Sequence, residues 1–483
     1  MTGVNSNQKA CTRHRFTVKD VAQLRQGLLC WYDANKRDLP WRRLITEPDI
    51  NVRGYAIWVS EIMLQQTQVK TVISYYNRWM RKWPTVHSLS TASLEEVNSL
   101  WSGLGYYSRA KLLHEAVKKV VNEFGGNLPQ TAEQLKCHLP GVGRYTACAI
   151  SSIAFSERVP VLDGNVMRVL TRLREIGSPI QLNTTNAVLW DLAEQLVDPN
   201  RPGDFNQAIM ELGAVCCKPK QPNCSECPLG KIGLCGAYES VRRRDSFKAK
   251  PFSQPTPDQR IPHPDVEDCG MCMPTDAYDS SLGVMNYPVK LSKRAARVER
   301  TIVIIAHTHD NGKTHFLLFQ RPRTGLLAGL WEFPSQIASA SQLNSKQTET
   351  SDDAVDDGVI LGSLVDRIAT SFNLFLEDKT QLKPKLIGEV VHLFSHIRMT
   401  YVVHTLSLHA LADRSPRVGR WIELSDLQNA SISTATRKIL SHFQATLQNE
   451  SPQKLSGEPN RNKRKSTTPL LDRKQMRLDN FFR

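Results

Sequence analysis

Four cysteines lie close enough in this sequence to surround one metal centre. Cys217, Cys224, Cys227 and Cys235 are spaced C-x6-C-x2-C-x7-C. Four thiolates can hold either zinc or an iron–sulfur cluster. A zinc ribbon usually pairs two C-x2-C units, and only one such unit is present here, so the spacing favours a [4Fe–4S] cluster. The adjacent Cys216 would compete as a ligand, and we interpret it as a buried spare thiol.

Basic residues are interleaved with these cysteines, at Lys218, Lys220 and Lys231. Because positive side chains attract phosphate, this loop is expected to shape a DNA-facing surface rather than to perform redox chemistry. The whole chain has 483 residues, with 62 Lys+Arg against 47 Asp+Glu and a net charge of +15. That excess favours a polyanionic partner, although many basic proteins bind none.

Two carboxyl groups lie in sequence surroundings that suit acid–base chemistry. Glu61 is flanked by Trp58, Ile62 and Leu64, an apolar environment that raises a carboxyl pKa; the alternative is an ordinary acid on a helix surface. Asp163 opens LDGNVMRVL just before a helical pattern, where the alternative role is a helix N-cap. One protonated and one ionised carboxyl group are what cleavage of a glycosidic bond through an oxocarbenium-like transition state needs.

A tight turn is predicted within LPGVGRYTA, where Pro140, Gly141 and Gly143 separate two helical patterns. Such a turn exposes backbone N–H groups at a helix N-terminus, which can bind phosphate. A plain turn without a ligand is the alternative reading of these glycines.

Composition excludes two broad classes of protein. With 40% hydrophobic and 23% charged residues the chain can bury a core, and it has no apolar run near the roughly 20 residues of a membrane span, so a membrane protein and a wholly disordered one are both excluded. Of its 11 cysteines, five fall within 216–235, which favours a metal site in a reducing compartment over secreted disulfides. Lys9, Arg13, Arg15 and Lys19 lie near the start without an acid, so a mitochondrial presequence stays open.

The hydrophobic pattern predicts a multidomain chain. Val69, Val72, Ile73, Tyr76, Trp79 and Met80 form one helix face, and similar stripes recur along an all-α region. The runs TIVIIA and THFLLFQ, and two more within 388–409, predict strands of a smaller α+β domain, with a helix near 360–370 and a polar insertion near 335–358. The predicted parts are a flexible N-terminus (1–17), the helical domain (18–235), a linker (236–298), the α+β domain (299–442) and a disordered basic tail (443–483).

Six motifs in order carry a family resemblance. VSEIMLQQTQV, LWSGLGYYSRA, LPGVGRYTA, LDGNVMRVL, FNQAIMELGA and the four-cysteine loop resemble the MutY-type adenine DNA glycosylases of the helix-hairpin-helix superfamily. The resemblance extends from about residue 20 to the C-terminus. It implies a helix-hairpin-helix domain with a [4Fe–4S] cluster and a Nudix-like domain, and removal of adenine mispaired with 8-oxoguanine or guanine in double-stranded DNA, which starts base excision repair.

The resemblance also implies roles for single residues. Glu61 matches the acid that protonates adenine at N7, and Asp163 matches the carboxylate that stabilises or captures the sugar cation. The other matches are Tyr145 and Asn165, which support these acids; Trp41, Arg42, Leu64 and Gln207, around the extruded adenine; and Gln66 and Tyr106, which fill or wedge the base stack. By residue type alone Tyr106 could equally be a core aromatic.

Position 145 separates two reaction types within the superfamily. Related bifunctional lyases carry a lysine there, whose amine forms a Schiff base with the sugar. Tyr145 cannot form one, so a monofunctional glycosylase is expected. A pyrimidine-damage glycosylase/lyase on the same fold and a catalytically silent DNA- or clamp-binding scaffold are the alternatives. Tyr145 and the added C-terminal domain oppose the first, and the presence of both Glu61 and Asp163 opposes the second.

The C-terminal domain begins like a Nudix hydrolase. GLLAGLWEFPS at 325–335 resembles the start of a Nudix box, but the carboxylates that would hold Mg²⁺ are absent downstream, so nucleotide hydrolysis is not expected. The resemblance instead implies a lesion-reading module, in which Phe394, Ser395 and His396 match the loop that senses 8-oxoguanine.

Further metal and partner sites are expected outside these domains. Cys269, Cys272 and His14 resemble part of the linker zinc site of animal family members, which uses three cysteines and a histidine; only two of the cysteines are evident.

The last gap in the [4Fe–4S] motif is seven residues where the family usually has five, so a KIG segment must loop out or the cluster is less stable.

The tail carries two short motifs. Gln475, Leu478, Phe481 and Phe482 match the motif by which partners dock on the replication sliding clamp. The run RNKRK at 461–465 is typical of a nuclear import signal, although it could be an ordinary solvated charge run. We expect a monomer in the nucleus, with the mitochondrion as a second location, that binds no membrane. The other expected partners are the checkpoint clamp, the abasic-site endonuclease and mismatch-recognition proteins.

Overall fold

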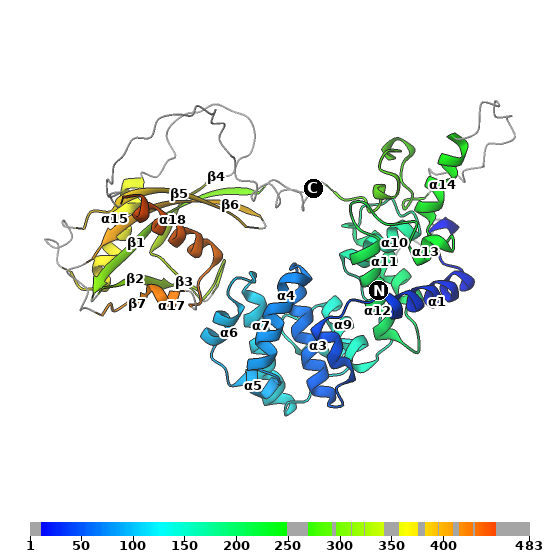
Figure 1. The fold of residues 1–483 in the computed structure, drawn as a ribbon, viewed down its shortest axis with the longest axis horizontal. Coiled ribbons are helices and arrows are strands. Elements are labelled where there is room, and N and C mark those ends of the chain that lie inside the picture. The colour runs from blue at the N-terminus through cyan, green and yellow to red at the C-terminus, as the bar shows by residue number, and fades with distance from the viewer. Residues whose placement is uncertain are drawn as a thin grey trace, which may run out of the picture. The chain divides into compact units, whose positions relative to one another are not determined.

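The computed structural model describes residues 11–248, 269–291, 296–310, 312–322, 324–341, 357–374, 382–394, 396–408, 415–427 and 430–450. Residues 18–248 form helices, and residues from 297 onward form a sheet with helices (Figure 1). The predicted fold class, an all-α region followed by an α+β domain, is therefore confirmed. No helix within the described residues combines the length and apolar content that a bilayer span requires.

The helical region consists of short and medium helices joined by tight loops. They are α1 (Val18–Asn35), α2 (Pro40–Arg43), α3 (Ile50–Leu64), α4 (Val69–Lys82), α5 (Val86–Ser90), α6 (Leu94–Trp101), α7 (Ser108–Phe124), α8 (Ala132–His138), α9 (Arg144–Phe155), α10 (Gly164–Leu173), α11 (Asn183–Leu196), α12 (Pro202–Glu211), α13 (Pro228–Lys231) and α14 (Gly236–Lys248). Side-chain caps start several of them, as in the capping box of Thr17 and Asp20 at α1. The stripe predicted on α4 is confirmed, since Val72, Tyr76 and Trp79 are buried.

Helix α3 lies at the centre of the helical core. Asp49 caps its first turn by accepting from the N–H groups of Asn51 and Val52, and every residue from Gly54 to Met63 is buried. Gly54 lets α9 approach closely, because a Cβ there would lie 2.6 Å from the Phe155 ring. Since α3 and α9 carry Glu61 and Tyr145, this close packing brings those two side chains together.

The predicted turn at 139–143 joins α8 to α9. Gly141 has φ +80°, a conformation that favours glycine. Gly143 is the N-cap of α9 and has no side chain to accept from the first-turn N–H groups. These donors are therefore left for another acceptor, as the phosphate interpretation requires.

The C-terminal domain contains one largely antiparallel sheet in the order β3-β2-β1-β6-β5, in which β4 also pairs with β1 and β7 with β2. Strand β6 pairs in parallel with β1 over the whole length of β6, from Arg297↔Ile397 to His307↔Ser407. Its elements are β1 (Arg297–Asp310), β2 (Lys313–Gln320), β3 (Trp331–Glu332), β4 (Ser335–Ser341), α15 (Asp357–Ser371), β5 (Lys385–Leu393), β6 (Ile397–Ser407), β7 (Arg420–Glu423), α17 (Leu424–Leu427) and α18 (Thr434–Glu450). The four strands and the helix predicted from sequence are all present.

Three predicted boundaries differ from the structure. Helix α14 fills the start of the predicted linker, and within 269–291 Tyr287 is buried and Gly177 N–H donates to Met271 O at 2.8 Å, so much of the linker packs against the helical region. The predicted tail starts too early, because α18 continues to Glu450 and buries Phe443. Within the predicted flexible N-terminus, residues 12–14 form a helical turn that buries His14.

Candidate active site

A pocket of about 530 Å³ gathers side chains from α2, α3, α9, α10 and α12. This volume lies within the range of roughly 300–1,000 Å³ typical of small-ligand sites. The fold therefore unites residues more than 160 positions apart in sequence. The sequence-predicted residues that line the pocket are Glu61, Asp163, Tyr145, Asn165, Trp41, Arg42, Leu64, Gln207 and Gln66.

Glu61 is the buried acid of this pocket. Its side chain is 5% exposed, and the Tyr145 hydroxyl donates to its Oε2 at 2.8 Å. Burial raises the pKa of Glu61 to about 7; the hydrogen bond from Tyr145 opposes that rise, and the nearby Asp163 adds to it. The pKa of Tyr145 itself is raised well above its ordinary value by burial, so its hydroxyl stays a donor. A carboxyl group with a pKa near neutrality suits general-acid catalysis.

Asp163 both caps α10 and faces the pocket. Its Oδ1 accepts from Val166 N–H at 2.8 Å, and its Oδ2 accepts from the Asn165 side-chain amide at 2.8 Å. Burial raises the pKa of Asp163, whereas these two donors favour the ionised form. The N-cap interpretation is therefore correct, and it coexists with a place in the pocket.

Arg42 orients the amide of Gln207, another residue that lines the pocket. Its Nε donates to Gln207 Oε1 at 3.0 Å, which leaves the amide NH₂ of Gln207 as the group free to donate. Arg42 is held in turn by Glu211, whose Oε2 lies 3.0 Å from Nη2. Arg37 pairs with the same carboxylate at 2.7 Å. Although burial raises the pKa of Glu211, the hydrogen bonds from Arg37 and Arg42 lower it overall, so this acid is a charged anchor.

Sequence reasoning missed Arg37 and Glu211, both of which line the pocket. Glu211 lies four residues after Gln207, on the same face of α12, and interrupts an apolar run. An acid at that spacing could have indicated a buried partner for Arg42. Arg37 offered no comparable signal, since its contact with Glu211 spans 174 residues.

The residues predicted to contact DNA lie outside the pocket or on its rim. Gln66 lines the rim and is exposed, whereas Tyr106 is 44% exposed on the loop before α7. Gly141 and Gly143 lie in the hairpin at α9. The structure thus excludes the alternative of a core aromatic for Tyr106.

All four predicted cluster cysteines line one small cavity, together with Cys216 and Arg172. Before Cys235, Lys231 ends α13, and Ile232 and Gly233 form a turn; all three residues are exposed, and Gly233 has φ +72°. The KIG segment of the longer last gap is therefore exposed, and Cys235 still lines the cavity. The Arg172 guanidinium donates to Cys217 Sγ at 3.3 Å, a contact that favours thiolate.

The cysteine loop is connected to the pocket through Arg168. Its Nη2 donates to Asn165 Oδ1 at 2.8 Å and to Gly213 O at 2.7 Å, and its Nε donates to Cys217 O at 2.8 Å. The loop starts in a π-helical turn, Leu212–Cys216, in which Cys217 N–H donates to Leu212 O at 2.7 Å. Because Asn165 donates to Asp163, the loop and the carboxylate share one hydrogen-bond network.

A second metal-ligand group forms where the N-terminal segment meets the linker. The ligand atoms of Cys11, His14 and Cys272 all lie within 4.8 Å of one another. His14 Nδ1 pairs with Arg174 O at 2.7 Å, so its Nε2, 3.2 Å from Cys272 Sγ, is the nitrogen available to a metal. Cys269 is also hydrogen-bonded to Cys272 and to the backbone of Cys11. Cys11, which the sequence analysis did not identify, therefore lies in one group with His14, Cys269 and Cys272.

The predicted lesion-reading turn joins β5 to β6. Phe394 N–H donates to Ile397 O at 2.8 Å, and the Phe394 ring packs edge-on against His392 at 4.6 Å. His396 is exposed. Ser395, the RNKRK run at 461–465 and the predicted clamp motif (Gln475, Leu478, Phe481 and Phe482) lie outside the described residues.

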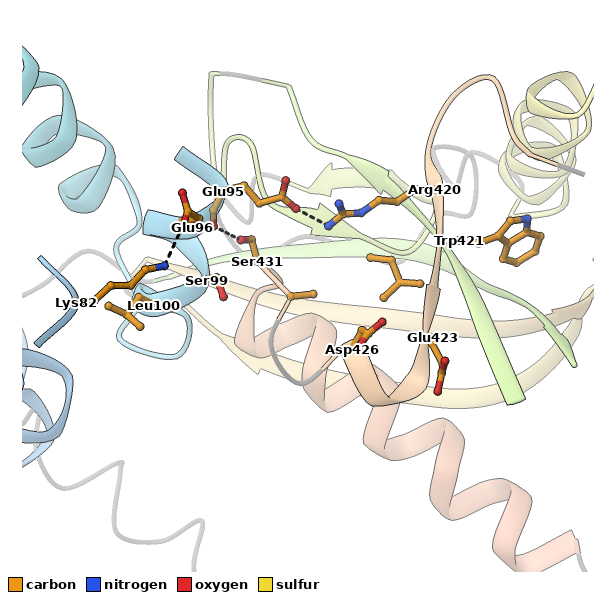
Figure 2. Close-up of a pocket in the computed structure, with 12 residues that line it drawn as sticks. Lys82, Glu95, Glu96, Ser99, Leu100, Arg420, Trp421, Glu423, Asp426 and Ser431 are labelled. Atoms are coloured by element: carbon orange, nitrogen blue, oxygen red, sulfur yellow. Dashed lines mark hydrogen bonds and ion pairs between the residues drawn. The ribbon is translucent and has the colours of Figure 1, made fainter. Parts of the chain in front are cut away.

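Another pocket, of about 470 Å³, is also rich in acids (Figure 2). Two of its acids are engaged in ion pairs: Glu95 lies 2.6 Å from Arg420, and Glu96 lies 3.1 Å from Lys82. Hydrogen bonds, chiefly with Ser93 and Lys82, lower the pKa of Glu96 to about 2. A carboxyl group held in the charged form is unsuited to proton donation, so the pocket around Glu61 is the better candidate.

Comparison with known proteins supports this assignment. Residues 59–195 match the family model described as "HhH-GPD superfamily base excision DNA repair protein", and residues 303–442 match "NUDIX domain". The chain is 43% identical to the adenine DNA glycosylase of Mus musculus, covering 97% of this chain and 87% of the mouse protein. It is 44% identical to that of Homo sapiens (96% and 82% covered) and 35% identical to that of Schizosaccharomyces pombe (87% and 89% covered).

Proposed function

Because this chain belongs to the adenine DNA glycosylases, we propose that it hydrolyses the N-glycosidic bond of adenine mispaired with 8-oxoguanine or guanine in duplex DNA. The family membership expected from the six motifs is confirmed, and with it a hydrolase of base excision repair. The observation that carries the proposal is the pocket itself, where a buried acid and a second carboxylate face one cavity beside a pre-oriented amide.

The reaction requires adenine to leave the base stack, since N7 and C1′ cannot be reached in a stacked duplex. Glu61, with a pKa of about 7, is substantially protonated at neutral pH and gives its proton to N7. The C1′–N9 bond then breaks, its electron pair leaves with adenine, and the sugar becomes an oxocarbenium-like cation. Tyr145 holds the Glu61 carboxylate through the 2.8 Å hydrogen bond after the proton has left.

Asp163 provides the negative charge that this cation needs. Its position is fixed by Val166 N–H and Asn165, and both donors favour the ionised carboxylate. Water then bonds to C1′, and the proton that it loses restores the acid form of Glu61. The products are free adenine and an abasic site.

The reaction stops at the abasic site because the pocket provides no suitable amine. Among the residues that line it, none is a lysine, and position 145 carries a tyrosine whose hydroxyl is engaged with Glu61. A Schiff base with the sugar needs such an amine. These observations support monofunctional action over a glycosylase/lyase.

The cysteine cavity supports a [4Fe–4S] cluster held by Cys217, Cys224, Cys227 and Cys235. A zinc ion bound at Zn–S distances of about 2.3 Å would bring its thiolates within about 4.6 Å of one another. Among the described residues, the ligand atoms of Cys11, His14 and Cys272 lie within a comparable distance, 4.8 Å, of one another. The sulfur atoms of the four cluster cysteines do not lie that close together. The cluster, when bound, would fix the loop next to Arg168.

The group of Cys11, His14, Cys269 and Cys272 supports zinc. Three thiols and an imidazole match the ligand types of a structural zinc site. The zinc would connect the N-terminal segment to the linker, and it would act on stability rather than on the chemical step.

The C-terminal domain supports 8-oxoguanine reading through the predicted residues Phe394, Ser395 and His396, since Phe394 lies just after β5, His396 lies just before β6, and His396 is exposed. The tail motif supports docking on the sliding clamp, which would direct the enzyme to newly replicated DNA. The basic run at 461–465 supports nuclear import, and the basic N-terminus supports a mitochondrial location for part of the protein.

Single-turnover base release tests the proposal. Duplexes carry adenine opposite 8-oxoguanine, guanine or thymine, and alkali cleaves the abasic product. We expect release from the first two and not from the third, fastest opposite 8-oxoguanine. Strand cleavage without alkali or heat would refute monofunctional action. Absence of release from every duplex, with DNA binding retained, would favour the silent scaffold.

A further inference from the structure

Two exposed side chains beside the pocket are held in an unusual backbone conformation. Gln66 has φ +53° and Tyr106 has φ +48°, in the left-handed region that L-residues rarely adopt. Gln66 follows the end of α3, the helix that carries Glu61, and lines the pocket rim. Tyr106 exposes 44% of its surface, a large share for an aromatic residue in a well-packed helical region.

One buried arginine connects the two segments. Arg109, on α7, is 8% exposed. Its Nη1 donates to Ile62 O at 2.9 Å, to Met63 O at 3.1 Å and to Gln65 O. These are carbonyls at the C-terminal end of α3, which have no partner within the helix.

The same guanidinium also holds the loop of Tyr106. Its Nη2 donates to Gly105 O at 3.0 Å, its Nε lies 3.4 Å from Tyr106 O, and its carbon lies 5.4 Å from the centre of the Tyr106 ring. Nη2 also reaches Thr67 Oγ1 at 3.3 Å, on the other segment. Burial lowers the pKa of Arg109 to about 10, which leaves it protonated at neutral pH.

The geometry points to Arg109 as the positioning residue that presets Gln66 and Tyr106 as a rigid pair, ready to fill the base stack when adenine enters the pocket. This inference rests on the proposed function. An emptied stack can be filled by a flat aromatic ring, which stacks on any base. Filling it with side chains that are already ordered avoids the loss of conformational freedom at that moment. Arg109 is buried and does not line the pocket, so it acts on extrusion and not on bond cleavage.

The test compares substrates that do and do not need extrusion. Arg109→Lys keeps the charge but loses the planar fork that reaches both segments. Single-turnover rates are measured on adenine mispaired with 8-oxoguanine and on adenine opposite an abasic-site analogue, where the base is unpaired. We expect a loss of about 10- to 100-fold on the mispair, since hydrogen bonds to a charged group are lost, and a loss of less than about threefold on the unpaired adenine.

Arg25→Lys is the matched control. Arg25 likewise donates to carbonyls at the end of a helix, those of Gln195 and Leu196 in α11 and of Val197 directly after it, at 2.7 to 3.0 Å. Its replacement should leave both rates unchanged. Fluorescence of 2-aminopurine next to the mispaired adenine reports extrusion directly, and Arg109→Lys should reduce its increase on binding.

Equal losses on both substrates would overturn the inference, because they would indicate general damage to the site, and so would an unchanged rate on the mispair. If Arg109→Lys lowers the melting temperature below the assay range, Thr67→Val answers the same question, since it removes one acceptor of the guanidinium. A double-mutant cycle with Tyr106→Ala should show that the Arg109→Lys loss shrinks when Tyr106 is absent. Absence of release by the unaltered enzyme would instead refute the proposed function.

Discussion

Replacing Tyr145 with phenylalanine should move the pH dependence of base release upward. In the proposed mechanism the acid form of Glu61 is the active one, so the rate of the unaltered enzyme should fall above about pH 7, the pKa of that group. The Tyr145 hydroxyl, 2.8 Å from Oε2, favours the ionised carboxylate. Its removal should therefore raise the pKa of Glu61 and extend the active form to higher pH.

The size of the shift follows from the hydrogen bond that is lost. A hydrogen bond to a charged group contributes roughly 1.5–3 kcal/mol, and one pKa unit corresponds to about 1.4 kcal/mol. Because a neighbouring hydroxyl also stabilises the protonated carboxyl to some extent, we expect the pKa of Glu61 to rise by about one unit. This shift would move the alkaline limb of the pH–rate profile from about pH 7 to about pH 8. At pH 8 the protonated fraction of Glu61 then rises from about a tenth to about a half.

The measurement is the single-turnover rate from pH 5.5 to 9.5, with attention to the position of the limb and not its height. Tyr76→Phe is the control, since among the described residues the Tyr76 hydroxyl is buried without a hydrogen-bond partner and its ring packs on Trp41 at 5.4 Å. A limb that stays in place or moves to lower pH in Tyr145→Phe would refute the assignment of Glu61 as the titrating acid.

Three further predictions follow from the same network. Glu61→Gln should abolish base release yet raise the free energy of unfolding at pH 8 by at most about 3 kcal/mol. The reason is that the raised folded-state pKa of Glu61 stabilises the protein fully below about pH 4.5, and this stability is lost as pH rises through about 7. Urea denaturation at pH 5 should therefore show little gain, and equal gains at both pH values would contradict this. Arg168→Gln should slow base release by about 10- to 100-fold, since it unties Asn165 from the cysteine loop; an unchanged rate with unchanged cluster absorbance would refute the link. Cys11→Ser should reduce bound zinc and lower the melting temperature, whereas Cys30→Ser, at an exposed cysteine of α1, should do neither; full zinc content in Cys11→Ser would exclude Cys11 as a ligand.

Short-range patterns predicted the pocket well. Glu61, Asp163 and Gln207 each lie in a segment whose hydrophobic spacing identifies a helix and whose residue order matches a known family. A helix of known type fixes which side chains share a face. The acids and the pocket residues carried over from the family accordingly lie in one cavity.

Residues whose partners are far away in sequence were missed. Glu211 binds Arg37 across 174 positions, and Cys11 meets Cys272 across most of the chain. Although Glu211 interrupts an apolar run, neither sequence segment indicates which distant partner it meets, because each contact depends on how whole elements pack. Strand β4 was missed for a similar reason: its small polar residues, SQIASAS, form a strand by pairing with β1.

The π-helical turn at Leu212–Cys216 determines in which direction the residues directly after it point. A π turn contains one residue more than an α turn, and an α-helix rotates by about 100° per residue. With the Cys217 N–H to Leu212 O bond in place, Cys217 lies where an unbroken α-helix would present residue 216. If the turn had α-helical geometry, Cys216 would point in the direction that Cys217 now has. The extra residue in this one turn therefore selects which of two adjacent thiols meets the Arg172 guanidinium.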